Sequence, residues 1–85
     1  MKLQFTRNFI KAYRHLPQPI QEATDKQLGL LLSNPAHPSL NRKKMQGAPG
    51  IWEARVTKGY RFTFQVEDDV YILRNIGTHD VLDKP

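Results

Sequence analysis

The sequence predicts an α+β fold in the order β-α-α-β-β-β, formed by one domain that spans residues 1–85. Apolar residues recur at helical spacing up to residue 33, and from Ile51 onward they alternate with polar residues as strands require. With 39% hydrophobic and 25% charged residues, the composition is that of a globular domain. A chain of 85 residues has room for one hydrophobic core and not for two.

The N-terminal part predicts a short strand and two helices. Residues 2–5 form the expected strand, and Thr6 can cap a helix that ends at Pro17. A second helix is expected to begin at Pro19, because proline is favoured in the first helical turn, and to end at residues 33–35. The two helices should form a hairpin that packs on one face of an antiparallel-rich sheet, and residues 34–50 should form a loop.

The C-terminal part predicts three strands. The apolar residues of the first two strands have a period of two: Trp52, Ala54 and Val56, then Phe62, Phe64 and Val66. A three-residue turn at residues 58–60 puts both apolar sets on one face, whereas a two-residue turn would mix the faces, so the longer turn is expected. The opposite face then carries Glu53, Arg55, Arg61, Thr63 and Gln65. The apolar run at 70–76 is typical of a central strand.

Several kinds of site are excluded by residue type. The absence of cysteine excludes disulfides, thiolate metal sites and cysteine nucleophiles, and it suits a reducing compartment. The three histidines have no paired ligand spacing, so neither a metal nor a cofactor is expected. No apolar segment is long enough to cross a bilayer and the N-terminus lacks a signal-peptide core, so we expect a cytoplasmic protein without membrane contact.

The net charge of +5 and the isoelectric point near 9.8 favour a polyanionic partner. RNA, DNA or an acidic protein would satisfy this charge, and so would a requirement for solubility alone. The basic residues that we expect to contact RNA are Arg42, Lys43, Lys44, Lys58 and Arg74.

The polar face also contains candidate catalytic residues. RNA is cut without a cofactor when its 2′-hydroxyl attacks the adjacent phosphate, which requires proton transfer and fixed positive charge. Arg55 and Arg61 could clamp the phosphate, although two arginines on an exposed strand are also typical of a merely solvated surface. His79 can transfer protons near neutral pH, and Asp80 is either its neighbour in the site or a turn residue. Glu53 is a candidate base or an ion-pair partner of the arginines.

The remaining two histidines, His15 and His37, are expected to be solvated surface residues. They lie at the end of a predicted helix and in the proline-containing loop.

Four segments taken together resemble the RelE/ParE superfamily of bacterial toxins over nearly the whole chain. They are Lys-Lys-Met-Gln-Gly at 43–47, Trp-Glu-Ala-Arg-Val at 52–56, Gly-Tyr-Arg-Phe at 59–62 and Gly-Thr-His-Asp at 77–80. The resemblance implies the RelE-like fold, a toxin of a type II toxin–antitoxin system, and a cognate antitoxin as partner. In the ribonuclease branch it implies a metal-independent endoribonuclease that cleaves mRNA, either free or on the ribosome.

Within that branch, the resemblance assigns phosphate binding to Arg61 and matches Arg55 to a basic residue of the preceding strand, where Glu53 departs from the family pattern. The ending at 77–79 is similar to that of YafQ-type ribonucleases and implies a catalytic role for His79. The tail has no aromatic residue for base stacking, which is a second departure. The resemblance leaves two alternatives open: a ParE-like inhibitor that binds DNA gyrase, and a catalytically inactive toxin homologue.

Overall fold

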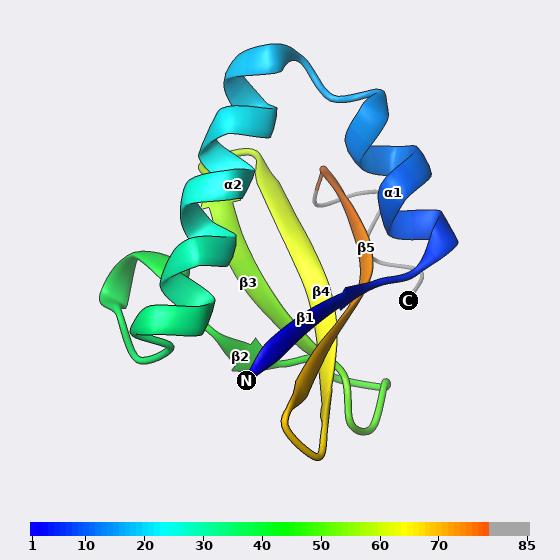
Figure 1. Ribbon diagram of the computed structural model, residues 1–85, viewed down its shortest axis with the longest axis vertical. Coiled ribbons are helices and arrows are strands. Elements are labelled where there is room, and N and C mark those ends of the chain that lie inside the picture. The colour runs from blue at the N-terminus through cyan, green and yellow to red at the C-terminus, as the bar shows by residue number, and fades with distance from the viewer. Residues whose placement is uncertain (79–85) are drawn as a thin grey trace.

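The computed structural model describes residues 1–78 of the chain, and it contains two α-helices, one short 3₁₀ helix and five strands (Figure 1). In chain order these elements are β1 (Lys2–Phe5), α1 (Arg7–Arg14), α2 (Gln18–Ser33), η1 (Pro38–Leu40), β2 (Lys43–Lys44), β3 (Trp52–Thr57), β4 (Tyr60–Glu67) and β5 (Val70–Thr78). The predicted order β-α-α-β-β-β is confirmed for β1, α1, α2, β3, β4 and β5, and η1 and β2 are additional elements. No helix in this part of the chain is long and apolar enough to span a membrane.

The five strands form one sheet in the order β1-β5-β4-β3-β2. Only β1 and β5 are parallel, and the other neighbours run antiparallel. Both helices lie on the same face of the sheet, with α1 packed against β5 and α2 against β3 (Figure 1). The expected α+β architecture with an antiparallel-rich sheet is therefore present.

The core lies between this face and the helices. Its fully buried side chains come from both helices, η1 and the three central strands, and include Phe9, Leu31, Leu40, Phe62 and Leu73. Thr6 links the start of α1 to the sheet, because its hydroxyl oxygen accepts from the backbone N–H of Phe9 and donates to the carbonyl of Leu73 at 2.9 Å. The predicted helix cap thus also fixes α1 against β5.

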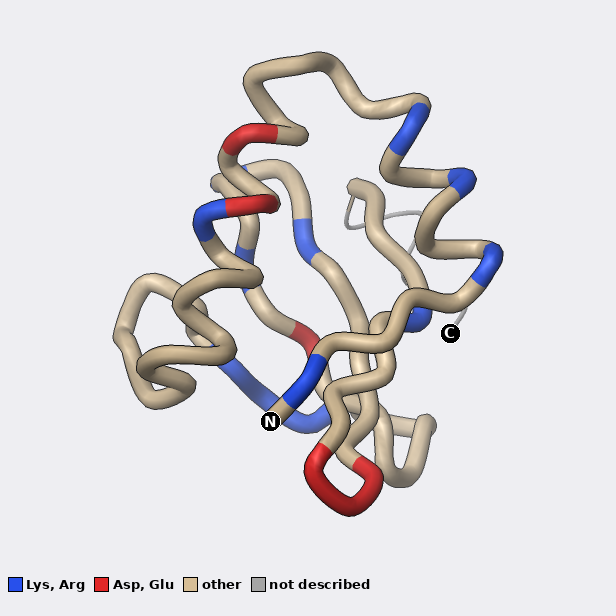
Figure 2. Tube along the Cα trace, viewed as in Figure 1, with Lys and Arg blue, Asp and Glu red and all other residues tan. Residues whose placement is uncertain are grey.

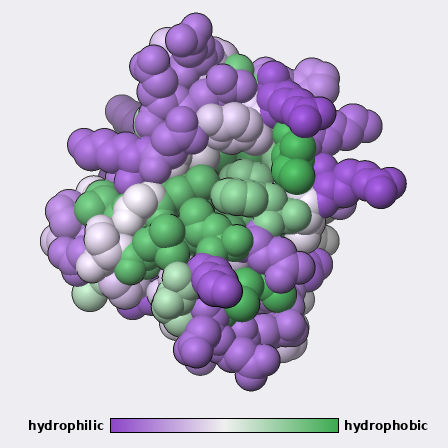
Figure 3. Space-filling model, viewed as in Figure 1, coloured by the Kyte–Doolittle hydropathy of each residue, from purple (hydrophilic) through white to green (hydrophobic). Residues whose placement is uncertain are grey.

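The two helices are joined by polar contacts near their connection. The Tyr13 hydroxyl donates to Asp25 at 2.7 Å, which raises the pKa of the tyrosine above its ordinary value, and Gln21 donates to the Tyr13 carbonyl. Between the helices lies an apolar groove of about 330 Å³, lined by Phe5, Phe9, Ile10, Tyr13, Arg14, Asp25 and Leu28. Figure 3 shows apolar side chains gathered in the middle of this face.

Two local predictions are wrong. The segment 34–50 is not only a loop, since it contains η1 and the two-residue strand β2. The turn between β3 and β4 has two residues, Lys58 and Gly59, because Thr57 pairs with Tyr60. A β-bulge then leaves Val56 without a partner, so that Arg55 faces Arg61 and the apolar sets still share one face. The prediction that the apolar residues of both strands share one face is correct, but the cause is the β-bulge and not the predicted three-residue turn.

Candidate functional site

The sheet face opposite the helices brings together polar residues from β2, β3 and β4. Lys43 lies opposite Glu53, and Glu53 lies opposite Thr63, so the three residues form one row across the sheet. The neighbouring row contains Arg55 opposite Arg61. Because directly opposed residues on antiparallel strands share a face, the register gathers these charges in one place.

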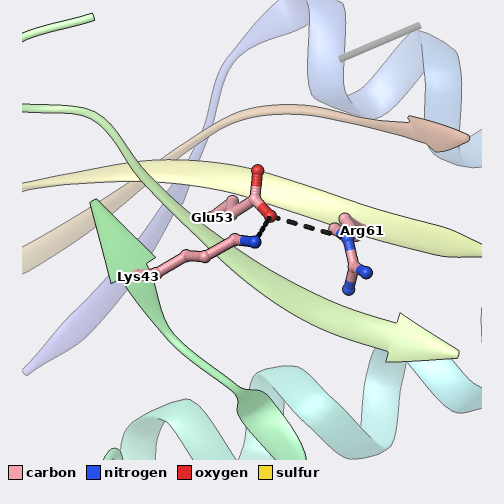
Figure 4. A network of polar contacts seen from close by, with 3 residues as sticks. All are labelled: Lys43, Glu53 and Arg61. Atoms are coloured by element: carbon pink, nitrogen blue, oxygen red, sulfur yellow. Dashed lines mark ion pairs between the residues drawn. The ribbon is translucent and has the colours of Figure 1, made fainter. Parts of the chain in front are cut away.

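Glu53 is the central charge of the group. Its Oε1 lies 3.5 Å from Nζ of Lys43 and 3.5 Å from Nε of Arg61 (Figure 4). The Glu53 side chain is 9% exposed and that of Arg61 is 18% exposed. A carboxylate this buried requires nearby positive charge, because the ionised form would otherwise lose its hydration without compensation.

The contact between Glu53 and Arg61 is an ion pair without a hydrogen bond. Oε1 of Glu53 and Nε of Arg61 are both buried, and among residues 1–78 neither has a hydrogen-bond partner. Figure 4 shows the two terminal nitrogens of Arg61 pointing away from the carboxylate. Buried polar atoms are nearly always hydrogen-bonded, so the attraction between the two charges must offset the lost hydrogen bonds here.

Arg55 reaches its place through the β-bulge of β3. It is exposed, and its backbone carbonyl accepts a hydrogen bond from Gln27 of α2 at 2.9 Å. Its Cα pairs with that of Arg61, but within residues 1–78 Arg55 forms no ion pair with Glu53, and it lines a cavity beside α2. Lys43 and Arg61 give the group two cations against the one carboxylate of Glu53. The group is therefore positively charged and suited to an anionic ligand such as a phosphate.

The other predicted RNA-binding residues are distributed over several places. Lys44 and Lys43 are adjacent in β2 and point to opposite faces. Lys44 and Arg42 both lie over the ring of Trp52, at 5.5 Å and 5.8 Å from its centre. Figure 2 shows the blue stretch of this basic segment and the red stretch of the acidic β4–β5 turn. The structure thus brings only Lys43 of this segment to Glu53.

Lys58 and Arg74 lie away from Glu53. Lys58 is exposed in the β3–β4 turn. Arg74 occupies a second bulge, between β4 and β5, and donates to Gln65 at 2.7 Å. Gln65 is four residues beyond Arg61 on β4, which corresponds to about 13 Å along a strand.

The predictions for His79 and Asp80 lie outside the described residues. His15 is exposed as expected, and its Nδ1 lies 2.8 Å from the carbonyl of Lys11. His37 is half-buried, and its ring caps η1 by accepting from the backbone N–H of Ser39. No group of three or more histidine, aspartate or glutamate residues that could hold a metal ion occurs within residues 1–78.

Sequence reasoning missed one structural residue of this region, Gln27. It is 5% exposed and lies on the inner side of α2 with Thr24, Leu28 and Leu31. A polar residue in the apolar stripe of a helix was the signal that could have identified it.

The two ion pairs of Glu53 offer a test of how burial controls their strength, since their lengths are equal. In double-mutant cycles with glutamine, we expect a coupling free energy of about 1–2 kcal/mol for Glu53 with Arg61. For Glu53 with Lys43, which is 57% exposed, we expect about 0.5 kcal/mol or less. Urea unfolding of the single and double variants measures both values. Equal coupling free energies in the two cycles would show that burial does not determine the strength of these ion pairs.

No family model and no curated protein matches the chain. Among solved structures, YafQ from E. coli strain BL21(DE3) has a TM-score of 0.76 at 18% identity, over 94% of each chain. The YoeB/ParE toxin from Agrobacterium tumefaciens has a TM-score of 0.79 at 19% identity, over 93% of this chain and 99% of that one.

A third similar structure is the intact RelBE toxin–antitoxin complex of E. coli. It has a TM-score of 0.70 at 26% identity, over 89% of this chain and 93% of that chain. These similarities extend across nearly the full length of each relative, and they agree with the resemblance of the four sequence segments. The chain has the fold of the RelE/ParE toxin superfamily.

Proposed function

We propose that the protein is the toxin of a type II toxin–antitoxin system and that it cleaves mRNA without a metal ion. The observation that carries this proposal is the arginine at position 61, which is held beside a buried carboxylate and has its terminal nitrogens turned away from it. A guanidinium in that position can donate two hydrogen bonds to one phosphate. The fold and the resemblance of residues 59–62 to the ribonuclease branch support the same conclusion.

The proposed reaction is an internal transfer at one phosphodiester of the RNA. The 2′-oxygen forms a bond to phosphorus as the bond to the 5′-oxygen breaks, and the products are a 2′,3′-cyclic phosphate and a free 5′-hydroxyl. One group must take the proton of the 2′-hydroxyl and another must supply a proton to the 5′-oxygen. Arg61, with Arg55 beside it, stabilises the negative charge that grows on the phosphorus oxygens.

Proton transfer is assigned to His79, on the resemblance of residues 77–80 to YafQ-type ribonucleases. Glu53 holds the guanidinium of Arg61 by charge at 3.5 Å. Because its carboxylate is already shared between two cations, we assign it to positioning and not to proton transfer. Asp80 is the alternative proton acceptor.

An antitoxin protein is the proposed partner, since one of the relatives was solved as a toxin–antitoxin complex. The apolar groove between α1 and α2 is the surface that we assign to it. The groove lining contains one cation, Arg14, and one anion, Asp25, and α1 as a whole carries Arg7, Lys11 and Arg14 and no acidic residue (Figure 2). An amphipathic segment with acidic residues on its polar side would match both the groove and α1.

Cleavage of RNA is tested with the purified chain and a labelled RNA. We expect fragments that end in a 2′,3′-cyclic phosphate, formed at the same rate with and without a chelator. Loss of cleavage on chelation, with the protein still folded by circular dichroism, would contradict the metal-independent reaction. A parent protein that never cuts RNA but inhibits DNA gyrase would establish the ParE-like alternative. Failure in both assays would indicate an inactive homologue.

Arg61 and His79 are expected to differ in how the cleavage rate depends on pH. Arg61→Ala removes a fixed charge, so the rate should fall about 100-fold or more at every accessible pH while the optimum stays in place. His79→Ala removes a proton-transfer group, so the rate should fall about 10²- to 10⁴-fold and one limb of the pH profile should disappear. Full activity of His79→Ala with an unchanged profile would transfer the role to Asp80 or Glu53.

The antitoxin groove is tested by placing a charge in it. Ile10 lines the groove and is 39% exposed, so Ile10→Lys should leave the fold intact and weaken antitoxin binding by about 10-fold or more. Val66 is a matched control, because it is 45% exposed on β4 and does not line the groove. Isothermal titration with the antitoxin measures both affinities, and an equal loss for Val66→Lys would contradict the assignment.

A further inference from the structure

A second basic site lies beside β3, in a cavity of about 420 Å³ between α2, η1 and that strand. Its lining combines an apolar wall of Ala23, Leu30 and Val56 with the polar residues Lys26, Gln27, His37, Ser39 and Arg55. Two of the polar residues are always cationic at neutral pH, and none of the lining residues is acidic. Of the residues that line this cavity, only Arg55 has a role in the proposed reaction.

The walls of the cavity are held together by Gln27. Its side-chain nitrogen donates to the backbone carbonyl of Ser39 at 3.2 Å and to that of Arg55 at 2.9 Å. Gln27 is 5% exposed, and Leu40 at the end of η1 is fully buried. These contacts fix α2, η1 and β3 relative to one another, so the cavity is a preformed part of the fold.

His37 is oriented by the residue two positions further along the chain. The backbone N–H of Ser39 lies 3.1 Å from Nδ1 of His37 and can only donate, so Nδ1 is the unprotonated nitrogen. The Ser39 hydroxyl, at 2.8 Å from the same atom, must therefore also donate. The proton of the neutral ring then resides on Nε2, which makes His37 a third hydrogen-bond donor of the cavity lining.

The two cationic residues of the cavity form no ion pair with the described part of the chain. Within residues 1–78, no carboxylate oxygen lies within 4.0 Å of the side-chain nitrogens of Lys26 or Arg55. Both side chains are exposed to solvent, which lowers the electrostatic cost of leaving them without an ion pair. Both nevertheless border the same cavity, together with His37. An anion in the cavity would have partners from three separate elements.

We propose that this cavity binds a phosphate group, held by Lys26, Arg55 and His37. Arg55 pairs with Arg61 across β3 and β4, so the cavity borders the strand pair that carries the candidate catalytic site. An RNA strand with one phosphate on Arg61 could place a neighbouring phosphate here. That the phosphate belongs to RNA rests on the proposed function. The affinity of the cavity for phosphate itself does not rest on it.

Affinity for phosphate is tested by titrating the isotope-labelled full chain with inorganic phosphate at constant ionic strength. We expect saturable amide shifts in the NMR spectrum at Lys26, Ser39 and Val56, and their loss in Lys26→Gln. Lys11→Gln is the matched control, since it removes the same charge from α1 and should leave the shifts unchanged. Absent or unsaturable shifts, or an equal effect of both variants, would overturn the proposal.

The RNA source is tested with a 2′-O-methyl oligonucleotide, which lacks the attacking hydroxyl and cannot be cleaved by the proposed reaction. Affinity is measured over a series of salt concentrations. Lys26→Gln should reduce the slope of log affinity against log salt by about 0.7, the value for one phosphate contact on a single strand, and Lys11→Gln should not. If inorganic phosphate causes saturable NMR shifts but Lys26→Gln leaves the salt slope unchanged, the cavity binds phosphate and the proposal that this phosphate belongs to RNA is overturned. Because no cleavage is measured, these results are independent of catalytic activity.

Discussion

The arrangement of the site depends on the requirement that the apolar residues of β3 and β4 face the same core. A two-residue turn at Lys58 and Gly59 would by itself place these residues on opposite faces. The bulge at Val56 removes the conflict, because the extra residue shifts the alternation of β3 by one position. Ala54 and Phe62 can then both be buried, at 1% and 0% exposure.

The same bulge organises the charges on the other face of the sheet. It sets Arg55 directly across from Arg61, and Glu53 one row further along. The Glu53 carboxylate, 3.5 Å from Nε of Arg61, offsets part of the positive charge on this face. A single backbone irregularity therefore serves both the hydrophobic core and the concentration of positive charge that an anionic substrate requires.

Gln27 connects the packing of α2 with both basic sites. The buried amide satisfies two backbone carbonyls, one of which belongs to Arg55 in the bulged strand. Bulges leave backbone groups without their usual sheet partners, and a buried carbonyl without a donor is costly. The polar residue in the apolar stripe of α2 is therefore explained by the irregular strand against which it packs. The phosphate cavity follows from the same contact.

The sequence alone determined the order of the two helices and the four longer strands, the cap at Thr6, and the division of the β3–β4 hairpin into an apolar and a polar face. Periodicity and local capping are enough for these features, because they depend on residues close together in the chain. The prediction of Arg55 and Arg61 as neighbours on that polar face also follows from alternation within the hairpin.

Only the tertiary structure decided the turn length, the pairing of β2 and the partners of each charge. Turn length was missed because a bulge compensates for it, so both registers give the same pattern of buried residues. The segment at Lys43 and Lys44 becomes a strand only when β3 is present to pair with it. The cavity at Gln27 and His37 forms only when α2, η1 and β3 pack together. These elements are distant in the chain, so local periodicity in the sequence cannot predict their contacts.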